Sequence, residues 1–197
     1  MGGSFDPVHN GHLALARAAL AEAELDSLIV MPARVQPFKQ ENEVTEVRHR
    51  EEMTRLAFAE LPQASISRYE LEQADEISYT VNTLLHLQES FLHEEIYFIC
   101  GTDSFLSMES WYRGVDILSG FGVIVSARPG YREEELRKMR CRYEQLYQTR
   151  IVQLAAQMPD ISSTDVRERV AAGRTISGLV PPAVERYIRS NGLYRKN

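Results

Sequence analysis

The chain opens with "MGGSFDPVHNGHLALARAAL", residues 1–20, in which a glycine-rich turn runs directly into a stretch rich in Ala and Leu. Such a stretch predicts a helix, here over about Gly11–Ala23. Gly2 and Gly3 let backbone N–H groups approach a ligand closely, and the free N–H groups at the helix start attract anions. The opening therefore predicts an anion-binding loop of the kind that normally follows a β-strand.

Two histidines of this loop, His9 and His12, are the first candidates for catalysis. Their spacing lets both lie on one side of the helix start, and Gly11 between them carries no side chain to shield the site. Imidazoles at a helix N-terminus suit a polyphosphate, because they can follow charge as it moves onto a leaving pyrophosphate. Zinc also binds such pairs, but no third ligand is evident nearby, so we predict no metal site. Taken alone, the two histidines could equally be helix-capping residues.

Beyond the loop, short apolar segments alternate with segments of helical periodicity, which predicts an α/β fold with a doubly wound parallel sheet. Strands are expected at Ser27–Met31 and within 64–71, 94–101, 121–130 and 149–156. Helices are expected within 45–61, 78–91, 102–120, 132–148, 163–173 and 181–192, with Thr45 a candidate N-cap and with Gly173 and Gly192 as left-handed caps. Ligands of such sheets bind beyond the carboxyl ends of the strands.

Length and composition limit the function classes. A chain of 197 residues suits one domain, 1–197, and a net charge of −6 disfavours nucleic acid and anionic membranes as partners. Cys100 and Cys141 match no metal spacing and are expected to be free thiols. Without an apolar span or a signal peptide, the expected location is the cytoplasm. The oligomeric state stays open, a homo-oligomer included.

Five segments, in order along the chain, carry a family resemblance. They are "GGSFDPVHNGH" (2–12), "SYTVNTL" (78–84), "ICGTDSFLSMESWYRGVDIL" (99–118), "ARPG" (127–130) and a segment beginning "ISSTDVRERVAAG" at 161. Together they resemble the nucleotidyltransferase superfamily whose members carry H-x-G-H, and within it the bacterial nicotinate-nucleotide adenylyltransferases. The resemblance spans nearly the whole chain.

This resemblance implies a Rossmann-like nucleotidyltransferase fold and a reaction. The adenylyl group of ATP would be joined to nicotinic acid mononucleotide, giving deamido-NAD and pyrophosphate, with Mg²⁺ bound mainly through the ATP phosphates. No covalent intermediate is needed, so catalysis would rest on positioning and charge stabilisation. Residues 157–197 would form a C-terminal helical part that completes the ATP site.

The resemblance also implies which residues contact ATP. His9 and His12 would stabilise the transition state, and the further ATP contacts would be Gly3, Ser4, Phe5, Gly101, Asp103, Ser163, Thr164 and Arg167. Simpler interpretations remain open for some of them. Ser162, with Asp165 three residues later, fits an ordinary N-cap. Asp103 also fits a helix N-cap, and Arg167 alone would be read as a solvated helix charge.

For the mononucleotide, the resemblance implies contacts by Lys39, Tyr79, Thr80, Trp111 and Arg128. The indole of Trp111 would stack on the nicotinate ring, although a large aromatic residue is usually part of a core. Backbone amides at residues 79–80 would bind the pyridine carboxylate. The two basic residues would contact the phosphate, although lone cations are usually solvated. The chain departs from the family at Phe38, which stands where a histidine is usual.

Three further hypotheses accompany this one. A pantetheine-phosphate adenylyltransferase shares the opening motif, but it is shorter and lacks both the S-Y-T segment and the tryptophan. A nucleotide-binding module without catalysis is disfavoured by the intact pair His9 and His12. Finally, family members carry an apolar strand before the opening motif, and only Met1 precedes it here. We therefore expect the first strand to be absent from this chain, because Met1 is an internal methionine or because the chain is truncated. If the chain starts at Met1, we expect a destabilised protein.

Overall fold

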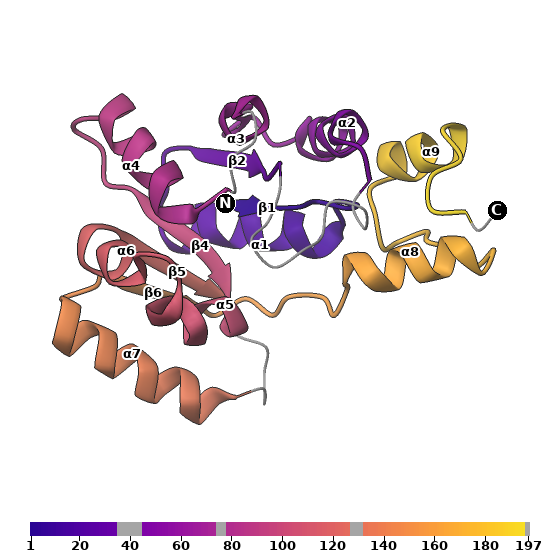
Figure 1. The fold of residues 1–197 in the computed structure, drawn as a ribbon. Coiled ribbons are helices and arrows are strands. Elements are labelled where there is room, and N and C mark those ends of the chain that lie inside the picture. Colours follow the sequence, from indigo (N-terminus) through magenta and orange to yellow (C-terminus); the bar gives the residue numbers. More distant parts are fainter. Residues whose placement is uncertain (35–44, 74–77, 127–131, 196–197) are drawn as a thin grey trace. The chain divides into compact units, whose positions relative to one another are not determined.

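Helices and parallel strands alternate along the chain (Figure 1), and the computed structural model describes residues 1–34, 45–73, 78–126 and 132–195. The strands are β1 (Gly2–Gly3), β2 (Leu28–Pro32), β3 (Ala64–Ile66), β4 (Tyr97–Gly101), β5 (Gly122–Ser126) and β6 (Ile151–Leu154). The helices are α1 (Asn10–Glu22), α2 (Val47–Phe58), α3 (Tyr69–Glu72), α4 (Thr80–Ser90), α5 (Thr102–Ser107), the 3₁₀ turn η2 (Met108–Ser110), α6 (Gly114–Gly120), α7 (Glu133–Tyr147), α8 (Ser163–Ala171) and α9 (Pro182–Ser190).

These elements divide into two compact units. Unit 1 consists of Met1, Ala18–Leu25 and Ser78–Met158, and unit 2 consists of Gly2–Arg17, Asp26–Ile77 and Pro159–Asn197. Unit 2 contains a sheet of order β1-β2-β3, and unit 1 a sheet of order β4-β5-β6. Every strand pair in both sheets is parallel. The expected α/β class with parallel strands is therefore confirmed in each unit.

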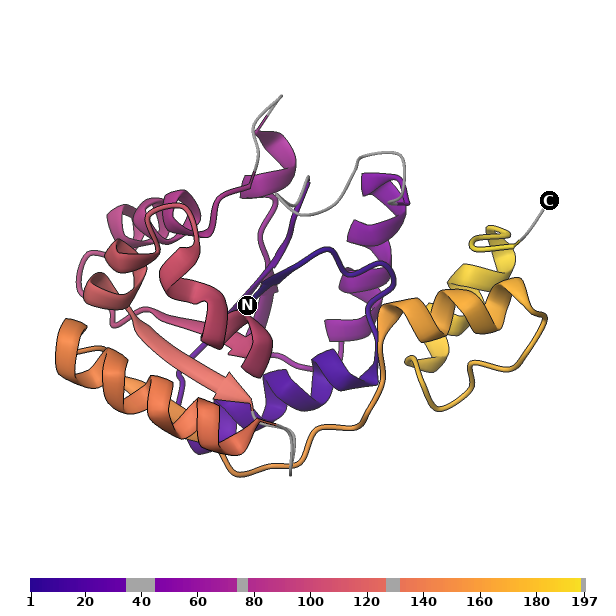
Figure 2. The same cartoon turned by 60° about the horizontal axis from the view of Figure 1, so that its bottom comes forward.

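The sheet of unit 2 is covered by α2, which also packs against α9. Met53 and Ala57 lie on the buried face of α2, while Val30 of β2 is completely buried. The last two helices, α8 and α9, lie side by side in both views (Figures 1 and 2). Both helices are followed by glycines in the left-handed region, Gly173 at φ 66° and Gly192 at φ 63°, as the sequence predicted.

The apolar strand that was expected to be absent would precede the opening motif, whereas β1 consists of two glycines of the motif itself. Gly2 and Gly3 form β1 and pair in parallel with Met31 and Pro32 of β2. The N–H of Ala33 then donates to the carbonyl of Gly3 at 2.8 Å, which extends the pairing by one bond. Because glycines lack a Cβ, this short strand needs no side-chain packing of its own, and hydropathy did not reveal it.

The core of unit 1 forms around β5, the middle strand of its sheet. All five residues of this strand are buried, because β4 and β6 flank it and helices cover it. Ile117 and Leu118 of α6 and Tyr143 of α7 belong to the same core and are fully buried. The helix α7 lies along this sheet, as Figure 1 shows. No helix within the described ranges is long and apolar enough to span a membrane.

Two local predictions were wrong. Residues 64–71 were expected to be one strand, but β3 ends at Ile66 and α3 begins at Tyr69. Thr45 is not the N-cap of α2: that position belongs to Glu46, and no side chain caps the helix. The N–H of Thr45 instead donates to the Asp6 carboxylate at 3.2 Å. Glu70 and Leu71 are both buried although they are neighbours, so the alternation expected of a half-exposed strand does not continue past Ile66.

Candidate active site

The opening loop of unit 2 turns sharply after β1. Phe5 has φ 46°, in the left-handed region, and its side chain is only 1% exposed. Its ring meets the ring of His12 edge-on, with the centroids 5.0 Å apart. The rings of His9 and His12 lie over one another with centroids 3.7 Å apart. The structure thus brings the two predicted histidines together at the start of α1.

Hydrogen bonding defines the proton position on His12. Its Nδ1 accepts the backbone N–H of His9 at 3.1 Å, so in the neutral ring the proton is on Nε2 and is available to a ligand. Burial lowers the pKa of His9 to about 4. Burial, and then the neighbouring His9, lower the pKa of His12 as well. Both rings are therefore neutral hydrogen-bond donors at pH 7.

Gly11 is required by the ring of His9. A Cβ at Gly11 would lie 2.9 Å from Nδ1 and 3.0 Å from Cε1 of His9. The same Nδ1 is buried and has no hydrogen-bond partner among the described residues. Because a buried polar atom without a partner is costly, this nitrogen is a candidate for a ligand contact, as donor or as acceptor according to the tautomer of the ring.

We predict that Gly11→Ala lowers kcat by about tenfold or more, because the added methyl group must displace the His9 ring. The unfolding midpoint should not fall, since Ala is the better helix former. Steady-state kinetics and a thermal melt test this, with Gly120→Ala as control, because no described atom lies within 4 Å of a Cβ at Gly120. Unchanged kcat in Gly11→Ala would contradict the role of the His9 ring.

The start of α8 lies against this loop. Ser162 caps the helix by accepting the N–H of Asp165 at 3.0 Å, which confirms the expected cap. Ser163 donates to the carbonyl of Pro7 at 2.9 Å. Arg167 donates to the carbonyl of Asp6 at 2.6 Å and to the hydroxyl of Thr164 at 3.3 Å. The free N–H groups and the guanidinium of α8 are thus close to the histidine loop, which favours an anion.

Sequence reasoning missed Arg50, which holds the other side of the loop. It is 1% exposed, and its guanidinium donates to the carbonyls of Ser4, Ala33, Arg34 and Thr45. Burial lowers the pKa of this guanidinium, and the charge of Asp6 acts in the opposite direction. The carbonyl of Ser4 therefore serves to fix the loop through Arg50. A charged residue among the buried positions of α2 was the only sequence signal.

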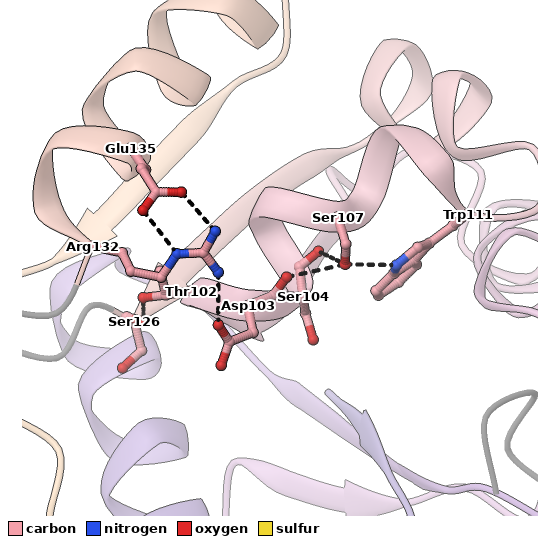
Figure 3. A network of polar contacts seen from close by, with 8 residues as sticks. All are labelled: Thr102, Asp103, Ser104, Ser107, Trp111, Ser126, Arg132 and Glu135. Carbon is pink, nitrogen blue, oxygen red and sulfur yellow. Dashed lines mark hydrogen bonds and ion pairs between the residues drawn. The ribbon is translucent and has the colours of Figure 1, made fainter.

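In unit 1, the predicted Asp103 lies on the first turn of α5, after β4. The N-cap of α5 is Gly101, so Asp103 is not the cap. Its carboxylate accepts from Arg132 at 3.2 Å, and Arg132 also pairs with Glu135 (Figure 3). With 72% of its side chain exposed, Asp103 stays accessible to a ligand. No described atom lies within 4 Å of a Cβ at Gly101, so the backbone there is open.

Trp111 follows η2 in the same unit. Its indole N–H donates to the hydroxyl of Ser107 at 3.1 Å, and that hydroxyl also bonds the carbonyl of Asp103 at 3.0 Å (Figure 3). One edge of the indole packs against Phe98, with ring centroids 5.9 Å apart. The ring is half-buried. Gly114 makes the turn fit, since a Cβ there would lie 1.9 Å from the carbonyl oxygen of Met108.

Tyr79 and Thr80 mark the start of α4. Tyr79 is the N-cap with φ −82° and ψ 125°, and no side chain caps the helix. The first N–H groups of a helix have no partner within it, so this end offers amide donors. The rings of Tyr79 and Tyr112 lie 4.5 Å apart. The predicted Lys39 and Arg128, and the departure at Phe38, lie outside the described residues.

Within the described ranges, no three His, Cys, Asp or Glu side chains come together as a metal site. The predicted site residues fall into two groups, one in each unit. Unit 2 contains the opening loop and the start of α8, and unit 1 contains the end of β4, the start of α4 and the residues after η2.

Proteins of similar sequence match this chain over nearly its whole length. The profile of the cytidylyltransferase-like family matches residues 1–169. A Carboxydothermus hydrogenoformans protein described as "probable nicotinate-nucleotide adenylyltransferase" is 38% identical, over 98% of this chain and 96% of its own. A Roseiflexus castenholzii protein of the same description is 40% identical, over 99% of this chain and 96% of its own.

Solved structures of low identity share the fold. The nicotinic acid mononucleotide adenylyltransferase of Plasmodium falciparum, complexed with APC, matches with a TM-score of 0.79 at 20% identity, over 98% of this chain and 94% of that one. The same enzyme complexed with NaAD matches with a TM-score of 0.77 at 21% identity and with the same coverage. The expected Rossmann-like α/β fold is thereby confirmed. The profile match and the full-length relatives show that this chain belongs to the cytidylyltransferase-like family and, within it, to the nicotinate-nucleotide adenylyltransferases.

Proposed function

We propose that this protein transfers the adenylyl group of ATP to nicotinic acid mononucleotide, with release of deamido-NAD and pyrophosphate. The observation that carries the proposal is the stacked pair His9 and His12 at the start of α1, with their centroids 3.7 Å apart. Both imidazoles are neutral donors, and the N-terminus of α8 adjoins them through Ser163. The family membership and the descriptions of the full-length relatives support the same reaction.

The chemistry is a direct displacement at phosphorus. A phosphate oxygen of the mononucleotide attacks the α-phosphorus of ATP, and the bond to the oxygen that bridges to the β-phosphate breaks. Pyrophosphate leaves with that electron pair. In this proposal, the Nε2 proton of His12 and the ring of His9 would bond the phosphoryl oxygens as charge increases on them; Nδ1 of His12 already accepts the N–H of His9. Preorganised donors of this kind stabilise the transition state more than the ground state.

The other proposed ATP contacts are those that the family resemblance implies. Ser163, Thr164 and Arg167 at the start of α8 would bind the β- and γ-phosphates, as residues of a C-terminal part that completes the ATP site. Backbone amides of Gly3, Ser4 and Phe5 would bind the nucleotide. Gly101 and the exposed Asp103 would contact the adenosine, with the carboxylate accepting ribose hydroxyls. Mg²⁺ would enter with ATP, bound to its phosphates, where it neutralises their charge.

The mononucleotide would bind through the residues at the start of α4 and after η2. Backbone N–H donors at Tyr79 and Thr80 would favour a pyridine carboxylate, which has two acceptor oxygens. A carboxamide would present its own NH2 donor to one of these N–H groups and leave that group unpaired. The indole of Trp111 would stack on the pyridine ring. The phosphate contacts assigned to Lys39 and Arg128 remain part of this proposal.

We predict that Trp111→Ala raises KM for the mononucleotide by about tenfold, because stacking on an aromatic ring is worth roughly 1–3 kcal/mol. The value of kcat and KM for ATP should change little. Trp111→Phe keeps an aromatic ring but loses the hydrogen bond to Ser107, so its KM for the mononucleotide should lie between those of the wild type and of Trp111→Ala. Initial-rate kinetics with each substrate varied would check this, and an equal rise of both KM values would contradict it.

A substrate panel tests the function. Pyrophosphate release is measured with ATP, Mg²⁺ and one of three acceptors: nicotinic acid mononucleotide, nicotinamide mononucleotide or 4′-phosphopantetheine. We expect turnover with the first acceptor, much slower turnover with the second and none with the third. Release with phosphopantetheine alone would establish the rival adenylyltransferase. No release with any acceptor, while ATP still binds, would indicate a nucleotide-binding module.

A further inference from the structure

Asp6 is a buried carboxylate in the middle of the phosphate loop, three residues before His9. It is 2% exposed. Its Oδ1 accepts the hydroxyl of Tyr194 at 2.7 Å, and its Oδ2 accepts the N–H of Thr45 at 3.2 Å. An ionised carboxylate is costly to bury unless donors surround it, so these two bonds hold the side chain in one place.

The backbone of the same residue contacts α8. The carbonyl of Asp6 accepts from Arg167 at 2.6 Å, and the next carbonyl, that of Pro7, accepts from Ser163 at 2.9 Å. The chain then passes through Val8, which is completely buried, to His9. A shift of the Asp6 side chain would therefore be transmitted both to the histidines and to the groups at the start of α8.

Tyr194 reaches this carboxylate from 188 residues away. After α9, Gly192 turns the chain at φ 63°, and Tyr194 itself has φ 63°. A non-glycine residue in the left-handed region is strained, and such strain persists where the surroundings hold it. Burial, and then the charge of Asp6, raise the pKa of Tyr194, so its hydroxyl keeps the proton it donates.

We propose that Tyr194 is a positioning residue for the phosphate loop, which acts through its hydrogen bond to Asp6 and sets the place of His9 and His12. The proposal rests on the proposed function for its kinetic consequence but not for its structural one. Tyr194 itself touches neither imidazole in any contact described here. It differs from a purely structural residue because loss of its hydroxyl should change the hydrogen bonding and NMR signals of His9 and His12 while the fold stays intact.

The test compares Tyr194→Phe with Tyr187→Phe. Tyr187 offers a matched control in the same unit, because its hydroxyl bonds the Nδ1 of His49 at 2.9 Å. Each variant loses one phenolic hydroxyl and keeps its ring. Two readouts are needed: steady-state kinetics with ATP and nicotinic acid mononucleotide, and nitrogen NMR signals of the five histidines in the full chain labelled with ¹⁵N-histidine. Substitutions of His9, His12 and His49 by glutamine assign the signals.

In Tyr194→Phe we expect kcat to fall about tenfold, because small displacements of catalytic groups are costly, while KM for the mononucleotide is unchanged. The ring signals of His12 should lose the pure Nε2–H pattern of the wild type. Tyr187→Phe should shift only the signals of His49 and leave kcat unchanged. A double-mutant cycle with Asp6→Asn tests the route of this effect. The double variant Asp6→Asn/Tyr194→Phe should have a kcat only slightly below that of Asp6→Asn alone, since the hydroxyl acts through the carboxylate.

Unchanged His9 and His12 signals in Tyr194→Phe would overturn the proposal, even if the unfolding midpoint fell. An equal loss of kcat in the two tyrosine variants would overturn it as well. If the wild type did not use nicotinic acid mononucleotide while the His12 signals still moved in Tyr194→Phe alone, the proposed function would fail and the positioning role would stand. The two failures are therefore distinguishable.

Discussion

His12→Ala is expected to lower kcat by about a thousandfold, because one preorganised donor to a developing charge is worth roughly 10²–10³ in rate. The Nε2 proton of His12 is available to a ligand, since Nδ1 already accepts the N–H of His9. Alanine removes both functions at once. Circular dichroism should show an intact fold, and single-turnover measurements with saturating substrates should show the loss in the chemical step.

Two further substitutions separate the functions of the His12 ring. His12→Asn places an oxygen near the position of Nδ1, so it can still accept the N–H of His9, but it has nothing at Nε2. His12→Gln places an amide N–H near Nε2 but loses the acceptor. We expect the asparagine variant to be stable and as slow as alanine, and the glutamine variant to be faster. Near-normal turnover in His12→Asn would show that the Nε2 proton is not used.

Arg50→Met is expected to lower the free energy of unfolding by about 3 kcal/mol or more. Methionine fills a similar volume but leaves four carbonyls, those of Ser4, Ala33, Arg34 and Thr45, without the guanidinium. It also leaves the buried Asp6 carboxylate without the nearby positive charge. Urea unfolding followed by circular dichroism measures the change.

The control for Arg50 lies on the same helix. The side chain of Arg48 is 73% exposed and pairs with Glu46, which is itself 68% exposed. Exposed pairs contribute little to stability, so Arg48→Met should leave the unfolding midpoint almost unchanged. Equal effects of the two substitutions would mean that the carbonyls around Arg50 find other donors, and that the loop does not depend on this side chain.

Local sequence patterns predicted the features that depend on neighbouring residues. The helix start with its two histidines, the cap at Ser162 and the left-handed turns at Gly173 and Gly192 all follow from a few consecutive residues. The family motifs indicated Trp111, which follows η2, and Tyr79 and Thr80, which lie at the start of α4. These features are determined by residues that lie within one or two helical turns of one another in the sequence.

Contacts between distant residues were not predictable in this way. Arg50 bonds Ser4 from 46 residues away, and no pattern in α2 shows which carbonyls it would meet. The pairing of Gly2 and Gly3 with β2 was missed because hydropathy has no signal for a strand of two glycines. The bond from the N–H of Thr45 to the Asp6 carboxylate was likewise not indicated by any local pattern. Each case depends on a partner that only the folded chain brings near.

The division into two units gives the chain two independent spectroscopic reporters. Its only tryptophan, Trp111, belongs to unit 1, whereas His9, His12 and His49 belong to unit 2. Tryptophan fluorescence therefore follows the melting of unit 1, and the resonances of these three histidines follow that of unit 2, whereas His86 and His93 belong to unit 1. If the two transitions coincide in urea, the protein unfolds as a single cooperative body; if they separate, each unit has a stability of its own.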